Sequence, residues 1–290
     1  MNNHGLSLQT LHFRQSTKKW KKTNLTALAL DCLTNLKIGE LDILGDMWPF
    51  YLLAKNYKRL HHLHLSNETA LANLYTNGGD INRGNTNEFI KKLEYEFATL
   101  DESAVPTMQL KSLSLCGLDL SMLVKDFLKP GIDFNNLDSL TLESCTELNR
   151  AFPMLIGARG IPHNTVGPLR LRTFVLRHEN PNQEFMIDLE IFLLSLRPLN
   201  SLHILLQGLG PGPSLESVLK FHGKALLSLI WDHRFKARTT ASISTTTRYG
   251  SFDHMRWIAK YCVRLQALGI TLDWETLSRS DEYHNKVRDL

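Results

Sequence analysis

The feature that most constrains this chain is a leucine pattern that occurs twice at a fixed distance. The pattern Leu-x-x-Leu-x-Leu begins at Leu110 and again at Leu137, so the two copies start 27 residues apart. In an extended strand alternate side chains point to the same face, so the last two leucines of each copy share one side. Such a strand cannot bury its leucines alone, and we therefore expect neighbouring copies that stack into one core.

Further copies extend the series over most of the chain. With the two above, nine copies fit the pattern, and the other seven span residues 8–13, 25–30, 60–65, 171–176, 199–204, 226–231 and 265–270. Residues 38–43 also fit, but they begin only 13 residues after Leu25, so we interpret them as an irregular return segment. From Leu110 onward the copies start 27 to 39 residues apart, which is typical of long, irregular leucine-rich repeats.

The segments between the copies predict helices and loops. Apolar residues at helical spacing predict helices over 46–57, 86–100, 214–223 and 255–262, and turn-rich or Ser- and Thr-rich composition predicts loops over 77–85 and 237–251. We therefore predict an α/β leucine-rich repeat solenoid, with a curved parallel sheet on its concave side and helices and irregular segments on its convex side. It should span residues 1–275 as one domain, followed by a polar C-terminal cap or tail at 276–290.

The first copy begins at Leu8, which leaves almost no room for the polar cap that normally protects a terminal layer. We therefore expect that this layer is covered by something outside the sequence, or that the chain is a fragment of a longer protein.

Composition argues against two classes of partner. The 33 basic and 29 acidic residues leave a weak net charge of +4, and we expect no nucleic-acid binding because phosphate-binding proteins concentrate their cations on one face. No apolar run approaches the roughly 20 residues of a membrane span. The four cysteines contain no C-x-x-C pair, and the N-terminus lacks a secretory signal, so we predict a cytoplasmic or nuclear protein.

Residues that alternate with the inward leucines should face the concave surface. Small hydroxyl side chains dominate its middle, with a few charged or imidazole groups, and such a surface suits a protein or peptide partner better than a small molecule. We therefore predict a non-enzymatic protein-binding module that uses no metal or cofactor. The partner-binding residues expected on this face are His62, His64, Ser112, Ser114, Ser139, Thr141, Glu143, Thr173, Arg177, His203 and Asp232.

Three groups of residues invite a catalytic or ligand-binding interpretation, and each has a simpler one. His62 and His64 share a strand face, but no acidic residue or cysteine completes a zinc site. Residues 208–213 contain three glycines, but Pro211 and Pro213 remove backbone donors that a phosphate loop requires. Cys145 stands where leucine-rich repeats place a buried residue that bonds to the turn backbone, which favours structure over nucleophilic chemistry.

The chain resembles the leucine-rich repeat region of fungal-type F-box proteins, through residues 137–145, the helix-then-strand phrase at 214–229 and residues 258–268. This resemblance implies the substrate-recognition part of an F-box-type ubiquitin ligase receptor. The F-box that would dock a Skp1-type adaptor has no counterpart before Leu8, so such an adaptor is expected only if an F-box exists outside this chain. Two alternatives are a truncated repeat protein without a ligase role and an enzyme with residues drawn from several repeats.

Overall fold

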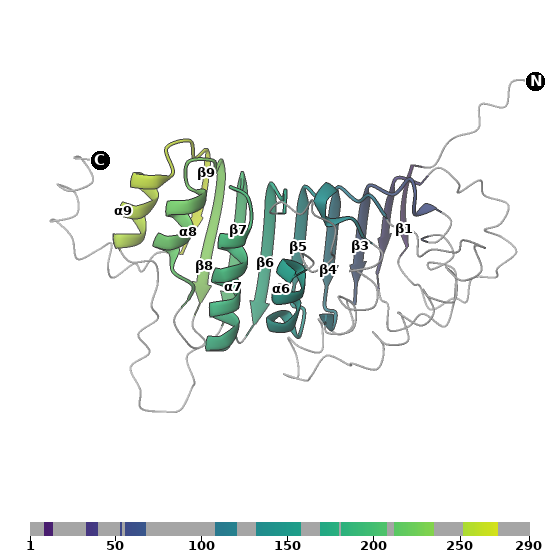
Figure 1. Ribbon diagram of the computed structural model, residues 1–290, viewed down its shortest axis with the longest axis horizontal. Coiled ribbons are helices and arrows are strands. Elements are labelled where there is room, and N and C mark those ends of the chain that lie inside the picture. The colour runs from purple at the N-terminus through teal and green to yellow at the C-terminus, as the bar shows by residue number, and fades with distance from the viewer. Residues whose placement is uncertain are drawn as a thin grey trace, which may run out of the picture. The chain divides into compact units, whose positions relative to one another are not determined.

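The chain folds as an α/β protein with parallel strands, which confirms the predicted class. The computed structural model describes residues 9–13, 33–39, 53, 56–67, 108–120, 132–157, 169–179, 181–207, 212–234 and 252–271. In these ranges the strands form one open sheet of nine, in which their order equals their order in the sequence, β1 to β9 (Figure 1). The chain divides into two compact units, unit 1 up to Val166 and unit 2 from Gly167.

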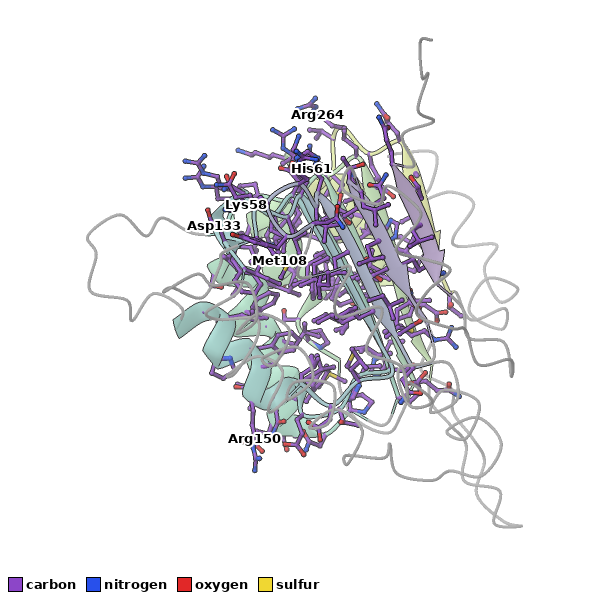
Figure 2. The ribbon with its side chains drawn as sticks, turned by 90° about the vertical axis from the view of Figure 1, so that its right-hand side faces the viewer. Lys58, His61, Met108, Asp133, Arg150 and Arg264 are labelled. Carbon is purple, nitrogen blue, oxygen red and sulfur yellow. The ribbon has the colours of Figure 1, made fainter. Side chains whose placement is uncertain are left out.

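Unit 1 contains short parallel strands with a well-defined register. In its described part the elements are β1 (Thr10–Phe13), β2 (Asn35–Ile38), β3 (His62–Ser66), β4 (Ser112–Cys116), the 3-10 turn η4 (Phe134–Asn136), β5 (Ser139–Glu143) and α6 (Leu148–Gly157). The inward leucines of neighbouring strands are partners, as in Leu63 with Leu113 and Leu113 with Leu140. Figure 2 shows Met108 inside this packed layer, and its side chain is fully buried.

Unit 2 alternates strands with helices more regularly. Its described elements are β6 (Thr173–Glu179), α7 (Gln183–Ser195), β7 (Ser201–Gln207), α8 (Leu215–His222), β8 (Ser228–Arg234), α9 (Phe252–Tyr261) and β9 (Ala267–Ile270). The helices lie on one side of the strands (Figure 2). On that side Phe174 of β6 packs against Phe192 of α7, with ring centroids 5.3 Å apart.

The leucine pattern determines where each strand begins. For eight of the nine predicted copies, a strand starts two residues after the position of the first leucine, as His62 follows Leu60. The other two pattern positions are buried in β3 to β8, because alternation turns both toward the helices. In β9 this burial is incomplete, since Leu268 is 42% exposed.

The second strand lies elsewhere than we predicted. β2 pairs with both β1 and β3 and is formed by the copy that begins at Leu33, so our interpretation of Ile38 as part of an irregular return segment was wrong. The copy predicted at 25–30 lies outside the described residues. Three overlapping matches between residues 25 and 43 compete in this part of the sequence, and only Leu33 preserves an interval near 27 residues before Leu60.

The predicted helices are confirmed where the structure describes them. The helix expected at 214–223 is α8, whose Ser214 hydroxyl accepts a hydrogen bond from the Ser217 N–H and caps its start. The helix expected at 255–262 is α9, which begins three residues earlier. Of the helix expected at 46–57, the residues Leu53 and Asn56 are helical. The segments 77–85, 86–100, 237–251 and 276–290 lie outside the described residues.

Two buried side chains at equivalent positions satisfy the backbone where a repeat begins. In unit 1 the Leu33 N–H donates to Asn56 Oδ1 at 3.2 Å, and in unit 2 the Leu199 N–H donates to His222 Nδ1 at 3.1 Å. Both acceptors stand 23 residues after the leucine that donates and four residues before the first leucine of the next copy. The two units therefore solve the same hydrogen-bonding problem with different side chains.

Candidate functional site

The candidate site is the face of the strands turned away from the helices, which we call the outward face. In unit 1 the strand register aligns its side chains into rows across neighbouring strands. The first row contains Asn35, His62, Ser112 and Ser139, the second contains Lys37, His64, Ser114 and Thr141, and the third contains Ser66, Cys116 and Glu143.

The rows of unit 1 are connected by hydrogen bonds across strands. His64 Nδ1 lies 2.8 Å from the Ser114 hydroxyl, and the Asn35 amide donates to Thr10 Oγ1 at 3.0 Å. Burial, followed by the nearby charges of His61 and Lys111, lowers the pKa of His62 below the usual histidine value. The outward face of unit 1 is therefore polar, and His62 is largely neutral at pH 7.

The third row of unit 1 is less accessible than its sequence position suggests. Ser66 and Cys116 are buried although their side chains alternate with the inward leucines. Cys116 Sγ lies 3.8 Å from Glu143 Oε2 across the strands, a contact that turns the thiol toward its neighbour in the row. Glu143 is the member of this row that stays partly exposed.

The outward face of unit 2 mixes hydroxyl, apolar and charged side chains. Its rows are Thr173, Ser201, Ser228 and Ala267, then Val175, His203, Ile230 and Gly269, then Arg177, Leu205 and Asp232. His203 Nε2 lies between two hydroxyl groups, 3.1 Å from Ser201 Oγ and 3.0 Å from Ser228 Oγ. Burial lowers the pKa of His203, so this imidazole is also mainly neutral at pH 7.

A pocket of about 230 Å³ opens at the carboxyl ends of β6, β7 and β8. The Arg177 Nε and Glu179 Oε1 atoms in its wall are 3.5 Å apart, and Asp232 Oδ1 accepts a hydrogen bond from Thr271 Oγ1 at 2.6 Å. Two carboxylates and one guanidinium thus give the wall a net negative charge. The lining residues are Arg177, His178, Glu179, Leu205, Leu206, Gln207 and Asp232.

Within each unit the structure brings the predicted site residues together on one face. In unit 1 these are His62, His64, Ser112, Ser114, Ser139, Thr141 and Glu143, and in unit 2 they are Thr173, Arg177, His203 and Asp232. The accessible fraction differs, because Asp232 is only 8% exposed whereas the Arg177 side chain is 47% exposed.

Sequence reasoning missed four residues of this face. Asn35 and Lys37 belong to β2, which we had assigned to another segment. Glu179 and Gln207 follow the end of the leucine pattern, because β6 and β7 run to seven residues. The continued alternation of buried side chains as far as Leu206 is the signal that could have revealed the longer strand.

The groups considered for chemistry have structural surroundings. Cys145 is 1% exposed, its Sγ lies 3.4 Å from the Leu115 carbonyl oxygen, and burial raises the pKa of its thiol to about 12. A nucleophilic thiolate is therefore disfavoured at this position. No group of three or more His, Cys, Asp or Glu side chains within the described ranges could hold a metal ion. Of the glycine-containing segment, Gly212 packs against His233, since a Cβ there would lie 2.8 Å from Nδ1.

Comparisons of the chain with family models, with curated proteins and with solved structures found no match. Among the helices of the described residues, none has the length and apolar character required to cross a membrane.

Proposed function

We propose that this protein is a recognition module of the leucine-rich repeat type that binds a protein partner on its outward face. The observation that supports this proposal is the register of the parallel strands. It aligns the side chains of five strands in unit 1 and of four in unit 2 into polar rows on the side that the helices leave open. A face with rows of short side chains suits the extended contact that repeat proteins make with other proteins.

The pocket in unit 2 supports a protein partner over a small molecule. Its volume of about 230 Å³ is below the roughly 300–1,000 Å³ of typical small-molecule sites. Its wall has Glu179 and Asp232 against a single guanidinium, and apolar contact is available from Leu205. These features favour one long, cationic side chain of a partner, with its ammonium or guanidinium group near the two carboxylates and its alkyl part against the leucine.

We further propose that the partner is a substrate of an F-box-type ubiquitin ligase, for which this chain would be the receptor part in the cytoplasm or nucleus. This finer proposal rests on the resemblance of residues 137–145, 214–229 and 258–268 to fungal-type F-box repeat proteins. It requires a Skp1-type adaptor bound through an F-box outside this chain. A repeat protein without a ligase role would share the outward face but would not recruit the adaptor.

The test compares proteins captured from cells by the full chain and by two variants. The double substitution Ser112→Arg/Gln207→Arg places a long cation on the outward face of each unit, and it should deplete specific partners at least tenfold by quantitative mass spectrometry. Glu184→Arg, on an exposed position of α7, is the matched control and should leave those partners in place. If the double variant captures the same proteins as the control, the outward face is not the binding surface.

A second measurement separates the general proposal from the ligase proposal. Co-expression with a Skp1-type adaptor, with and without the sequence that precedes Met1 in the genome, should recover the adaptor only with the longer form. Failure to recover it while outward-face partners persist would contradict the ligase role and leave the recognition module intact.

A further inference from the structure

The amino-terminal edge of the strands in unit 2 gathers exposed basic side chains. The turns directly before β6, β7, β8 and β9 each contribute at least one arginine or lysine, all exposed. We call these residues the basic edge: Arg170, Arg172, Arg197, Lys224 and Arg264. Figure 2 labels Arg264, whose side chain points away from the strands at this edge. The basic edge is separate from the outward face, since its residues precede the strands.

Acidic residues are absent from these turns and collect at the opposite end of unit 2. Residues 169–172, 196–200, 223–227 and 262–266 contain no Asp or Glu. A helix that joins two parallel strands starts where the first strand ends, so the first turns of the helices lie near the carboxyl ends of the strands. Those first turns contain Glu184, Glu216 and Asp253, and β6 ends on Glu179. Charge in unit 2 is therefore segregated along the strand direction.

Backbone hydrogen bonds hold the turns of the basic edge in register. The Asn200 N–H donates to the Arg172 carbonyl at 2.8 Å, and the Leu227 N–H donates to the Asn200 carbonyl at 2.7 Å. The Gln266 N–H continues the series by donating to the Leu227 carbonyl at 2.8 Å. Neighbouring turns thus follow the strand spacing of about 4.8 Å, and the edge is a straight, fixed row of cations.

The cations of this row are not neutralised within the part of unit 2 that the structure describes. Arg170, Arg197, Lys224 and Arg264 form no ion pair with another described residue, in contrast to Lys220, whose Nζ lies 2.9 Å from Glu216 Oε1. Like charges held at this spacing repel one another, so an anionic partner that lies along the row would stabilise it.

We propose that the basic edge binds an acidic, extended polypeptide segment that runs across the turns with its carboxylates facing the arginines and the lysine. The four turns span about three strand spacings, roughly 15 Å, which about five extended residues cover. Four of the five cations are arginines, whose planar guanidinium groups match carboxylates with two hydrogen bonds. This binding does not depend on the outward face.

The composition of the edge favours an acidic polypeptide over the other anionic partners. Its four turns contain no Phe, Tyr, Trp or His, whereas proteins that bind single-stranded nucleic acid combine cations with aromatic platforms for the bases. Binding to an anionic membrane surface uses an apolar helix face beside the cations, and these turns are not helical.

Fluorescence anisotropy with the full chain and a labelled peptide of twelve glutamates tests the proposal. The wild type should bind the peptide in a saturable manner, and affinity should fall as salt increases from about 50 to 200 mM because the contacts are ionic. Arg197→Glu/Lys224→Glu should weaken binding at least about tenfold, since two charge-assisted contacts become repulsive. Arg197→Gln/Lys224→Gln should give an intermediate loss.

Matched controls keep the result interpretable. Arg256→Glu/Lys260→Glu makes the same change of charge on α9 and should weaken binding less than threefold. Circular dichroism should show that both charge-reversed proteins remain folded, as expected for exposed residues. Equal losses in the edge and α9 variants, or no saturable binding by the wild type, would overturn the proposal. Tighter binding of a twelve-nucleotide polyuridylate or of phosphatidylserine vesicles with the same edge dependence would also overturn it.

Discussion

The two units build the same repeat but differ in almost everything outside the leucine positions. In unit 1 the described strands have four or five residues and an outward face of polar rows. In unit 2 three strands have seven residues, and Val175, Leu205 and Ile230 add apolar surface to the face. Shared inward leucines thus set strand position and register, while strand length and outward chemistry vary independently.

The amino-terminal edges differ in the same way. In unit 1 the residues before the strands include Lys58, Arg59 and Lys111 but also Asp133 and Asp138, so charges of both signs alternate. In unit 2 the corresponding turns are basic throughout. The comparison indicates that unit 2 has the stronger electrostatic specialisation, and it makes the two units natural controls for each other.

The largest expected effect tests whether the units are equally dependent on their helices. Phe192→Ala in α7 and Phe152→Ala in α6 each remove a fully buried ring, and each should lower the free energy of unfolding by about 3–5 kcal/mol. Hydrogen exchange followed by mass spectrometry should assign the loss from Phe192→Ala to peptides of β6, α7 and β7, because Phe192 packs on Phe174. A loss below about 1 kcal/mol in either helix would show that its unit does not rely on helix packing.

The next effect distinguishes the units by pH. Burial lowers the pKa of His222 to about 4 from its ordinary value of 6.5, since the neutral ring accepts from the Leu199 N–H and Nε2 lies 3.0 Å from the Leu193 carbonyl oxygen. Above pH 6.5 both folded and unfolded states hold this ring neutral, so nothing is lost there. As pH falls toward 4 the unfolded state takes up the proton alone, and unit 2 should lose about 3 kcal/mol.

The equivalent position in unit 1 makes this pH effect specific. Asn56 does not titrate, so peptides of β2 and β3 should not share that dependence on His222. Hydrogen exchange at pH 7 and pH 4.5 in wild type and in His222→Asn measures the difference, because the variant keeps an acceptor but removes the proton-binding group. An unchanged pH dependence in His222→Asn would assign the effect to other histidines.

A smaller effect tests whether the two buried acceptors do the same work. Asn56→Leu and His222→Leu leave the Leu33 and Leu199 N–H groups without their acceptor, and each should cost about 1–3 kcal/mol. His222→Asn should cost less than His222→Leu at pH 7, since it transfers the solution found in unit 1 to unit 2. Chemical denaturation of the three variants provides the measurement. Equal losses for His222→Asn and His222→Leu would contradict the equivalence of the two positions.

The sequence predicted the strands better than the site, and particular residues explain why. Leucine spacing predicted eight strand starts because burial of alternate leucines leaves one register that hides them. It failed at β2, where Leu25, Leu33 and Ile38 all begin acceptable copies and only packing against both neighbours selects Leu33. The roles of Asn56 and His222 could not be predicted, because each bonds to a backbone group 23 residues away. The pocket depends on β6 and β7 extending past the pattern, which tertiary pairing determines.

The smallest expected effect compares the histidines of the two outward faces. His64 contacts one hydroxyl group, that of Ser114, whereas His203 Nε2 lies within hydrogen-bonding distance of both Ser201 and Ser228. Ser114→Ala removes the only hydroxyl contact of its pair and should cost about 1 kcal/mol, while Ser228→Ala leaves Ser201 in place and should cost less than about 0.5 kcal/mol. Ser201→Ala/Ser228→Ala removes both contacts, so its cost should rise to that of Ser114→Ala. Thermal unfolding of the four proteins at pH 7.5, where these rings are neutral, measures the ranking. If Ser228→Ala alone matched the double variant, a single hydroxyl would hold His203, and the outward faces of the two units would be anchored in the same way.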